Sequence, residues 1–231
     1  AWVFIRKYTN WSMVIEFGGS DRNHVSFIIE NGESGLPWFA VRAGTKWQEI
    51  ASGVSLELNS WVHLACALNG NSATIYINGV EVGSGNIATL PNNVIRKNNR
   101  IGRSSRGNFA DANAMYDEIR IWNIAKSTAE IQSTINTSLS GDESGLVGYW
   151  NFDDGTAKDL TPNGNDGEMK GDAQIVNLND LPVGITIEDN LCKPAKELVI
   201  NISIQNLGQR AKMTFDLVFD PAILQANAIV K

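Results

Sequence analysis

The chain has 231 residues, which is room for more than one domain around a sizeable core. Its formal net charge of -6, without a basic run, disfavours nucleic acid or an anionic membrane surface as the main partner. No apolar stretch approaches the ~20 residues that cross a bilayer, so we expect no membrane insertion.

The first 83 residues alternate between apolar and polar positions, in short runs separated by turn residues. Asn78-Gly79 between two such runs is the strongest short signal for a β-hairpin. Turns about every ten residues are typical of an antiparallel sandwich or barrel. The expected strands are residues 2–6, 13–17, 24–30, 38–42, 54–58, 61–68, 73–77 and 80–82.

Residues 84–115 are polar and irregular, and they carry a group of arginines and lysines between Arg96 and Arg103. Two interpretations stay open for this segment. It is either a solvated loop face or a contact surface for an acidic or hydroxylated ligand, with Arg103 as the candidate contact.

Residues 116–123 alternate as one β-strand is expected to, with Asp117, Ile119 and Ile121 on one face. A carboxylate such as Asp117 on an apolar face needs backbone N–H groups, a cation or a metal as its partner. The strand leads into Ser127-Thr128-Ala129-Glu130, a capping box that predicts a short helix.

Residues 145–152 form another expected strand, and the loop after it is rich in Asp, Asn and Gly. The oxygen ligands of this loop suit calcium, although the spacing is not that of an EF-hand. The alternative is that the same residues serve turn formation only.

The pattern of residue types along the sequence changes near residue 176. We expect a linker at residues 179–183 and a second β unit at residues 184–231, with strands at 184–188, 198–204 and 214–221. About 48 residues are too few for an independent sandwich, so this unit is expected to be the opening part of one.

The two cysteines, Cys66 and Cys192, give neither a disulfide framework nor a metal knuckle, and Cys66 is expected to be a buried apolar side chain. No signal-peptide pattern is recognisable. The chain opens inside an expected strand, so a signal or other upstream segment is expected to be missing.

Residues 1–178 resemble the laminin-G-like, concanavalin A-like lectin/glucanase superfamily. The resemblance implies an all-β fold, a two-sheet antiparallel jelly-roll sandwich with one short helix, here expected to lack strands at its front. It also implies a structural calcium and a glycan or cell-surface protein as partner. The phrases that carry the resemblance, in order, are Ala1-Trp2-Val3, Trp61-Val62-His63-Leu64-Ala65, Ile75-Tyr76-Ile77-Asn78-Gly79, Arg100-Ile101-Gly102-Arg103, Tyr116 to Asn123, Ala129-Glu130-Ile131 and Gly145 to Asp153.

The tail resembles the first strands of a cohesin-type bacterial surface domain, through the phrase Phe215-Asp216-Leu217-Val218-Phe219-Asp220-Pro221. This resemblance implies an extracellular, modular bacterial protein, secreted or at the cell surface, and a dockerin-like partner. The tail is therefore expected to be a partial second β-sandwich.

Three functions are weighed for the chain. In a non-catalytic carbohydrate-binding or adhesion module, Trp11, Trp38 and Trp47 near turns could stack on sugar faces, although each could equally belong to the core or its rim. A structural spacer or assembly module without a soluble ligand is the second. A glycoside hydrolase is disfavoured, because the Glu-x-Asp-x-x-Glu run of the superfamily's glucanases is absent and adjacent Asp117 and Glu118 point to opposite faces of a strand. We therefore expect no enzyme activity.

The resemblance to the superfamily's glucanases implies that Asp117 binds a structural calcium, because they carry a similar Asp-x-x-Arg strand. The loop after residue 152 could add Asp153 or Asp159 as a further ligand. The alternative for Asp117 is that it caps backbone N–H groups.

Overall fold

The computed structural model describes residues 1–176, except 20, 21, 31, 33 and 108, together with the backbone of 185–187 and 202–204. The chain divides into two units, Ala1–Ile175 and Val176–Lys231. The expected linker at 179–183 and the strand expected at 214–221 lie outside the described residues.

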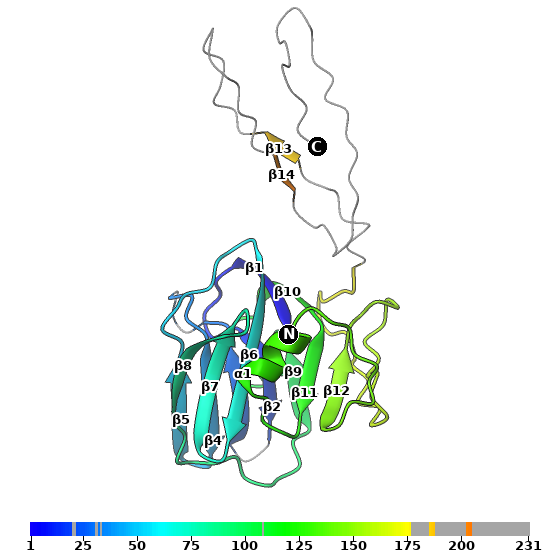
Figure 1. The fold of residues 1–231 in the computed structure, drawn as a ribbon. Coiled ribbons are helices and arrows are strands. Elements are labelled where there is room, and N and C mark those ends of the chain that lie inside the picture. Colours follow the sequence, from blue (N-terminus) through cyan, green and yellow to red (C-terminus); the bar gives the residue numbers. More distant parts are fainter. Residues whose placement is uncertain are drawn as a thin grey trace, which may run out of the picture. The chain divides into compact units, whose positions relative to one another are not determined.

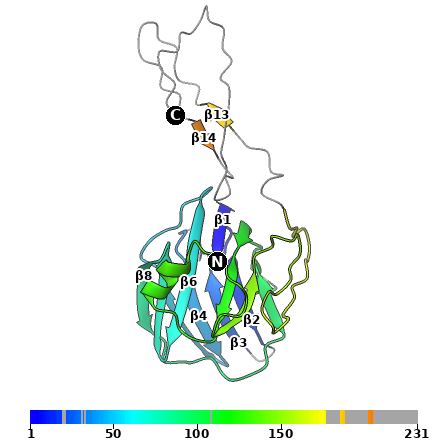
Figure 2. The same cartoon turned by 45° about the vertical axis from the view of Figure 1, so that its right-hand side comes forward.

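The first unit is built from two five-stranded antiparallel sheets (Figures 1 and 2). This confirms the expected all-β, two-sheet fold with one short helix. The first sheet has the order β10 (Asn113–Asp117), β1 (Trp2–Lys7), β6 (Trp61–Asn69), β7 (Ser72–Ile77), β8 (Val80–Asn86). The second has the order β5 (Lys46–Ala51), β4 (Trp38–Ala43), β3 (Asn23–Ile28), β2 (Met13–Gly18), β9 (Asn98–Ile101).

The main hydrophobic core lies between the two sheets. Val3, Val62 and Ile75 of the first sheet belong to the same buried cluster as Phe27 and Val41 of the second. Because side chains alternate along a strand, Ile28 and Ala40 lie on the opposite, outer face of the second sheet. Met13, Ile28 and Ala40 form a smaller buried cluster there. Something must therefore cover part of this outer face, and the site described below does so.

The strand expected at residues 116–123 is broken at Glu118, so the expectation of one continuous strand is wrong. Glu118 has φ of 51°, in the left-handed region, and it separates β10 from β11 (Ile119–Trp122). β11 pairs with β12 (Leu146–Trp150) in a separate two-stranded sheet. The break also shifts the alternation: Tyr116, and not Asp117, packs against the core between the sheets.

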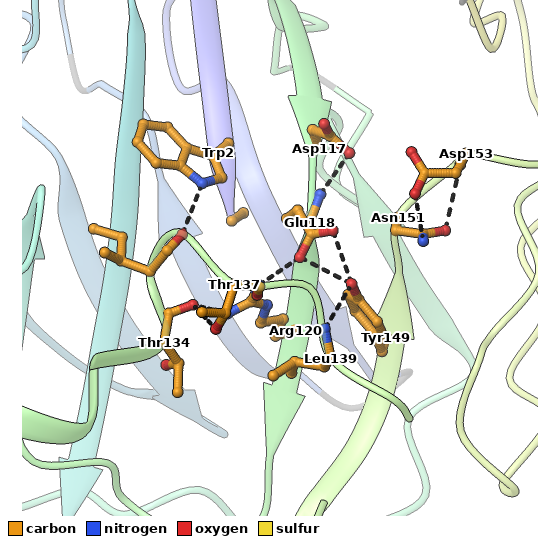
Figure 3. A network of polar contacts seen from close by, with 12 residues as sticks. Trp2, Asp117, Glu118, Arg120, Thr134, Thr137, Leu139, Tyr149, Asn151 and Asp153 are labelled. Atoms are coloured by element: carbon orange, nitrogen blue, oxygen red, sulfur yellow. Dashed lines mark hydrogen bonds and ion pairs between the residues drawn. The ribbon is translucent and has the colours of Figure 1, made fainter. Parts of the chain in front are cut away.

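A polar network stabilises this break (Figure 3). The Tyr149 hydroxyl donates to Glu118 at 2.8 Å, and Arg120 forms an ion pair with the same carboxylate. Arg120 also donates to the backbone carbonyls of Thr134 and Thr137, at and just beyond the end of α1 (Thr128–Thr134), at 2.8 and 2.6 Å. The last carbonyls of a helix lack partners within the helix, so this arginine joins the helix end to the strand break.

Two expectations based on short motifs are confirmed. Asn78 and Gly79 both have positive φ, 52° and 75°, as a tight hairpin turn between β7 and β8 requires. The capping box is also present, because Ser127 Oγ accepts from Glu130 N–H while the Glu130 carboxylate accepts from Ser127 N–H. α1 begins at Thr128, directly after the capping residue Ser127.

The strand expected at residues 54–58 is wrong, since that segment is a loop and the strand lies earlier, at β5. Leu56 is buried and holds the loop through its backbone: its N–H donates to Gly35 O, and its carbonyl accepts from the Tyr8 hydroxyl. The apolar alternation at 54–58 therefore reflects one anchoring side chain and not a paired strand.

In the second unit, β13 (Ile185–Ile187) pairs antiparallel with β14 (Ile202–Ile204). These two strands fall within the segments expected at 184–188 and 198–204. The phrase on which the cohesin-like interpretation rests, residues 215–221, lies outside the described residues.

Candidate functional site

A cleft lies on the outer face of the second sheet, and three aromatic and two cationic side chains line it. Its volume is about 310 Å³. The lining residues, which we call the aromatic cleft, are Trp11, Arg42, Thr45, Trp47, Arg106 and Phe109.

The cleft is assembled from segments that are distant in sequence. Trp11 lies two residues before the start of β2, whereas Arg42 on β4 and Trp47 on β5 face each other across the hairpin that contains Thr45. Arg106 and Phe109 belong to the loop between β9 and β10. The site therefore depends on how this loop is held against the sheet.

The aromatic side chains and Arg106 form one continuous run. The rings of Trp11 and Phe109 are stacked, with centroids 5.3 Å apart and planes inclined by 16°. The Arg106 guanidinium carbon lies 4.5 Å from the Phe109 centroid and 5.1 Å from the Trp47 centroid. Cation–π contacts of this kind are attractive and fix the position of the charge.

Glu16 anchors the loop from below. Its carboxylate is fully buried on β2 and accepts from Ser105 N–H at 2.7 Å and from the Ser105 hydroxyl at 2.6 Å. Arg106 pairs with it at 3.1 Å, and the hydroxyls of Ser26 and Ser104 donate to it at 3.1 and 3.2 Å. His24 Nδ1 lies 3.8 Å from the same carboxylate. A buried carboxylate requires such partners, so the loop and the sheet are tied at this point.

The electrostatics of the anchor follow from these contacts. Burial opposes ionisation of Glu16, but the hydrogen bonds from Ser105 and the charge of Arg106 outweigh it and hold the pKa of Glu16 below its ordinary value. Burial lowers the pKa of Arg106, and Glu16 partly offsets this effect. The two side chains therefore form a charged, hydrogen-bonded pair, with Arg106 in the cleft lining and Glu16 beneath it.

Gly18 permits the close approach of the loop. A Cβ atom at this position would lie 2.6 Å from Ser105 Oγ and 2.7 Å from the carbonyl oxygen of Asn98. Any side chain there would force the Ser105 side chain and the β9 backbone at Asn98 to move away.

The structure brings two of the expected ligand-binding residues together in the cleft, Trp11 and Trp47. Trp38 does not line it; this side chain packs against the small buried cluster beneath, and its indole nitrogen has no hydrogen-bond partner among the described residues. Arg103 is also outside the cleft lining, and it forms an exposed ion pair with Asp111 at 2.8 Å.

Sequence reasoning missed Arg42, Thr45, Arg106 and Phe109. Arg42 could have been found, because a hairpin centred on Gly44 and Thr45 places it opposite Trp47. No local signal identifies Arg106 and Phe109, since their placement depends on Glu16, 90 residues before Arg106.

The expected metal ligands lie in two groups. Asp117 and Asp153 lie near the strand break, as the close-up view shows (Figure 3). Burial raises the pKa of Asp117 to about 6, and the charges of Glu118 and Asp153 add to this effect. The Asp117 carboxylate accepts from Glu118 N–H at 2.8 Å, which is the capping role considered as its alternative.

Asp159 lies in a separate network. Its Oδ1 accepts from the N–H groups of Tyr149 and Thr161, and its Oδ2 accepts from the backbone and the side chain of Asn165, all at 2.8–3.0 Å. These bonds give Asp159 a structural role in holding the loop to β12. Within the described part of the chain, no three His, Cys, Asp or Glu side chains are grouped to hold a metal ion. Calcium binding stays a prediction.

No helix among the described residues has the length and apolar character of a membrane-spanning segment. A comparison with curated protein sequences gave no match. Solved structures do match, among them a Bacteroides ovatus ATCC 8483 protein to which carbohydrate binding has been attributed. It has 19% sequence identity and a TM-score of 0.57, and the match covers 76% of this chain and 54% of that protein. At this identity the likeness concerns the fold.

Two further structures are similar at lower scores. Domain 4 of AbnA, an extracellular arabinanase from Geobacillus stearothermophilus solved with arabinotriose, has 18% identity and a TM-score of 0.47, over 57% of this chain and 62% of that one. A heptameric SAP-like pentraxin from Limulus polyphemus has 15% identity and a TM-score of 0.41, over 72% of this chain and 78% of that one. This chain thus spans only about half to two thirds of the length of the first two proteins.

The family comparison covers more than half of the chain. Residues 1–132 match the model Laminin_G_3, described as the concanavalin A-like lectin/glucanases superfamily. This match does not extend to the tail, and it agrees with the two-sheet sandwich found in the structure. The chain belongs to the concanavalin A-like lectin/glucanase superfamily.

Proposed function

We propose that this chain is a non-catalytic carbohydrate-binding module of an extracellular bacterial protein, and that a saccharide binds in the aromatic cleft. The observation that carries the proposal is the cleft itself. Three aromatic rings offer apolar surface for a pyranose ring, and Thr45, Arg42 and Arg106 offer hydrogen-bonding groups for its hydroxyls. The Bacteroides ovatus protein of the same fold, to which carbohydrate binding is attributed, agrees with this proposal.

The chemistry of the cleft supports binding without bond cleavage. Glycoside hydrolysis in most families needs two carboxyl groups about 5 to 9.5 Å apart on either side of the scissile bond. Among the described residues that line the cleft, none is Asp or Glu. Glu16 lies beneath it, fully buried and engaged by Arg106 and three serines.

We also propose a structural calcium ion near the break between β10 and β11, with Asp117 and Asp153 as ligands. The donor chemistry fits, because carboxylate oxygens are the ligands that calcium prefers. Like charges at Asp117, Glu118 and Asp153 disfavour one another, and a divalent cation would offset this repulsion.

Glycan-array screening followed by titration calorimetry tests the binding proposal. We expect at least one oligosaccharide to bind, and Trp47→Ala to weaken its affinity by about tenfold or more, which corresponds to about 1.4 kcal/mol. Incubation with the same ligand should release no reducing sugar. Trp122→Ala is the matched control, because Trp122 lies on β11 and contacts Lys126, outside the cleft.

The outcomes separate the alternatives. If no saccharide binds, the module is a spacer or an assembly element and the proposal is wrong. If a saccharide binds with equal affinity to Trp47→Ala and Trp122→Ala, the chain is a lectin but the site lies elsewhere. Release of reducing ends would indicate a hydrolase.

A further inference from the structure

The lining of the aromatic cleft holds two arginines and, among the described residues, no carboxylate. Arg42 and Arg106 both line it, and Arg96 lies close enough to act on the same neighbour, His24. Burial is the main cause of the lowered pKa of His24; Glu16 opposes it, and Arg106, Arg42 and Arg96 add to it. Arg42 also lowers the pKa of Arg106, as two like charges in proximity do.

Arg106 is already paired, whereas Arg42 is not. The Glu16 carboxylate forms an ion pair with Arg106 at 3.1 Å and so neutralises its charge. Arg42 donates from Nε to the carbonyl oxygen of Gly44 at 3.3 Å, and among the described residues no hydrogen bond or ion pair engages its two terminal nitrogens. This leaves four N–H donors and a full positive charge on a half-buried side chain of the cleft.

Among the described residues, no Asp or Glu forms an ion pair with Arg42. Glu49, on β5, is exposed and accepts a hydrogen bond from the Trp47 indole nitrogen. Asp111 is exposed and pairs with Arg103. A free guanidinium beside aromatic rings is suited to a planar anionic group, which it can bind through two parallel N–H···O bonds.

We infer that the aromatic cleft binds an acidic saccharide, with the carboxylate of a uronic acid unit on the terminal nitrogens of Arg42. The inference rests on the proposed function and specifies the ligand class of the same site. The sugar ring lies against the aromatic run of Trp11, Phe109 and Trp47. Arg106, whose charge Glu16 neutralises, holds Phe109 and Trp47 in position. Selectivity against neutral saccharides follows, because they leave the charge of Arg42 unpaired.

Matched ligands that differ only in charge test this inference. The probes are oligosaccharides of galacturonate, of mannuronate and of glucuronate-containing chains, each compared by calorimetry with its fully methyl-esterified form. We expect at least one acid to bind tenfold or more tightly than its ester. Arg42→Gln should reduce this preference to about twofold or less. Arg42→Lys should retain part of the preference, because lysine keeps the positive charge but lacks the planar guanidinium that donates two parallel hydrogen bonds.

Arg6→Gln is the control for general loss of positive charge, since Arg6 is exposed on β1. It should leave the preference unchanged. Salt provides a second readout that needs no variant: raising the sodium chloride concentration should weaken binding of the acid several-fold and leave the ester unaffected.

Three results would overturn the inference: esters that bind as tightly as acids, an acid preference that survives in Arg42→Gln, or binding only of sulfated oligosaccharides that contain no uronic acid. If neutral saccharides bind as tightly as acidic ones and Trp47→Ala weakens their binding, the proposed function stands while the inference fails. If no saccharide of any kind binds, both fail.

Discussion

Replacement of Glu16 by glutamine removes the charge that ties the β9–β10 loop to the sheet and keeps the shape of the side chain. The carboxylate is fully buried, and it accepts hydrogen bonds from Ser26, Ser104 and Ser105 while pairing with Arg106. The glutamine side chain cannot form the ion pair with Arg106. Its NH₂ group would also face the serine hydroxyl and N–H donors from which the carboxylate accepts hydrogen bonds. Breaking a buried ion pair from one side costs about 3–5 kcal/mol, so we expect Glu16→Gln to lower the free energy of unfolding by about that amount.

The matched control removes the second ion pair of the same loop. Asp111 and Arg103 pair at 2.8 Å, but both side chains are about half exposed, at 57% and 49%. Exposed pairs contribute about 0–1 kcal/mol. Urea unfolding at pH 7, followed by tryptophan fluorescence, should therefore separate Glu16→Gln from Asp111→Asn by about 2 kcal/mol or more.

The pH dependence gives the same prediction a second test. The folded pKa of Glu16 lies below its ordinary value of 4.5, so its contribution to stability is present above about pH 4.5 and is lost as the pH falls through the folded pKa. The stability difference between wild type and Glu16→Gln should therefore narrow below that pH. A loss in Glu16→Gln no greater than that in Asp111→Asn, or a difference constant from pH 7 to pH 3, would refute the reasoning.

Three further predictions concern other parts of the molecule. Tyr149→Phe should cost about 1–2 kcal/mol in urea unfolding, because the hydroxyl donates to Glu118 and accepts from Leu139 N–H; the full stability of wild type in this variant would contradict the network. Burial raises the pKa of the Cys66 thiol to about 12, so in a Cys192→Ser background Cys66 should resist Ellman's reagent at pH 8 until urea unfolds the protein. Removal of calcium by chelator should lower the melting temperature of wild type and have no effect on Asp117→Asn; the same melting temperature with and without chelator in wild type would count against the calcium proposal.

The features predicted correctly from the sequence are those fixed by neighbouring residues. The Asn78-Gly79 turn needs only two residues that tolerate positive φ between alternating runs, and both have it. The capping box of Ser127 and Glu130 closes within four residues. Each motif therefore specifies its own structure without help from the rest of the chain.

The wrong expectations share a different cause. The run at residues 116–123 alternates perfectly, but nothing in its alternation reveals that Glu118 adopts a positive φ and ends β10. That break is stabilised by Tyr149, 31 residues later. Likewise, Leu56 is buried in the main core although it lies on a loop and not on a strand. Tertiary contacts overrode the local period in both segments.

The candidate site illustrates the same limit and explains the form of the cleft. Trp11 and Trp47 could be selected as aromatic candidates near turns, but their partner Phe109 is placed by the bond from Arg106 to Glu16, which spans 90 residues. Because Arg106 contacts both Phe109 and Trp47, the rings are held before any ligand arrives. A site fixed in this way loses little conformational freedom on binding, and its affinity then depends on the groups that are still unpaired. Arg42 is such a group in this cleft.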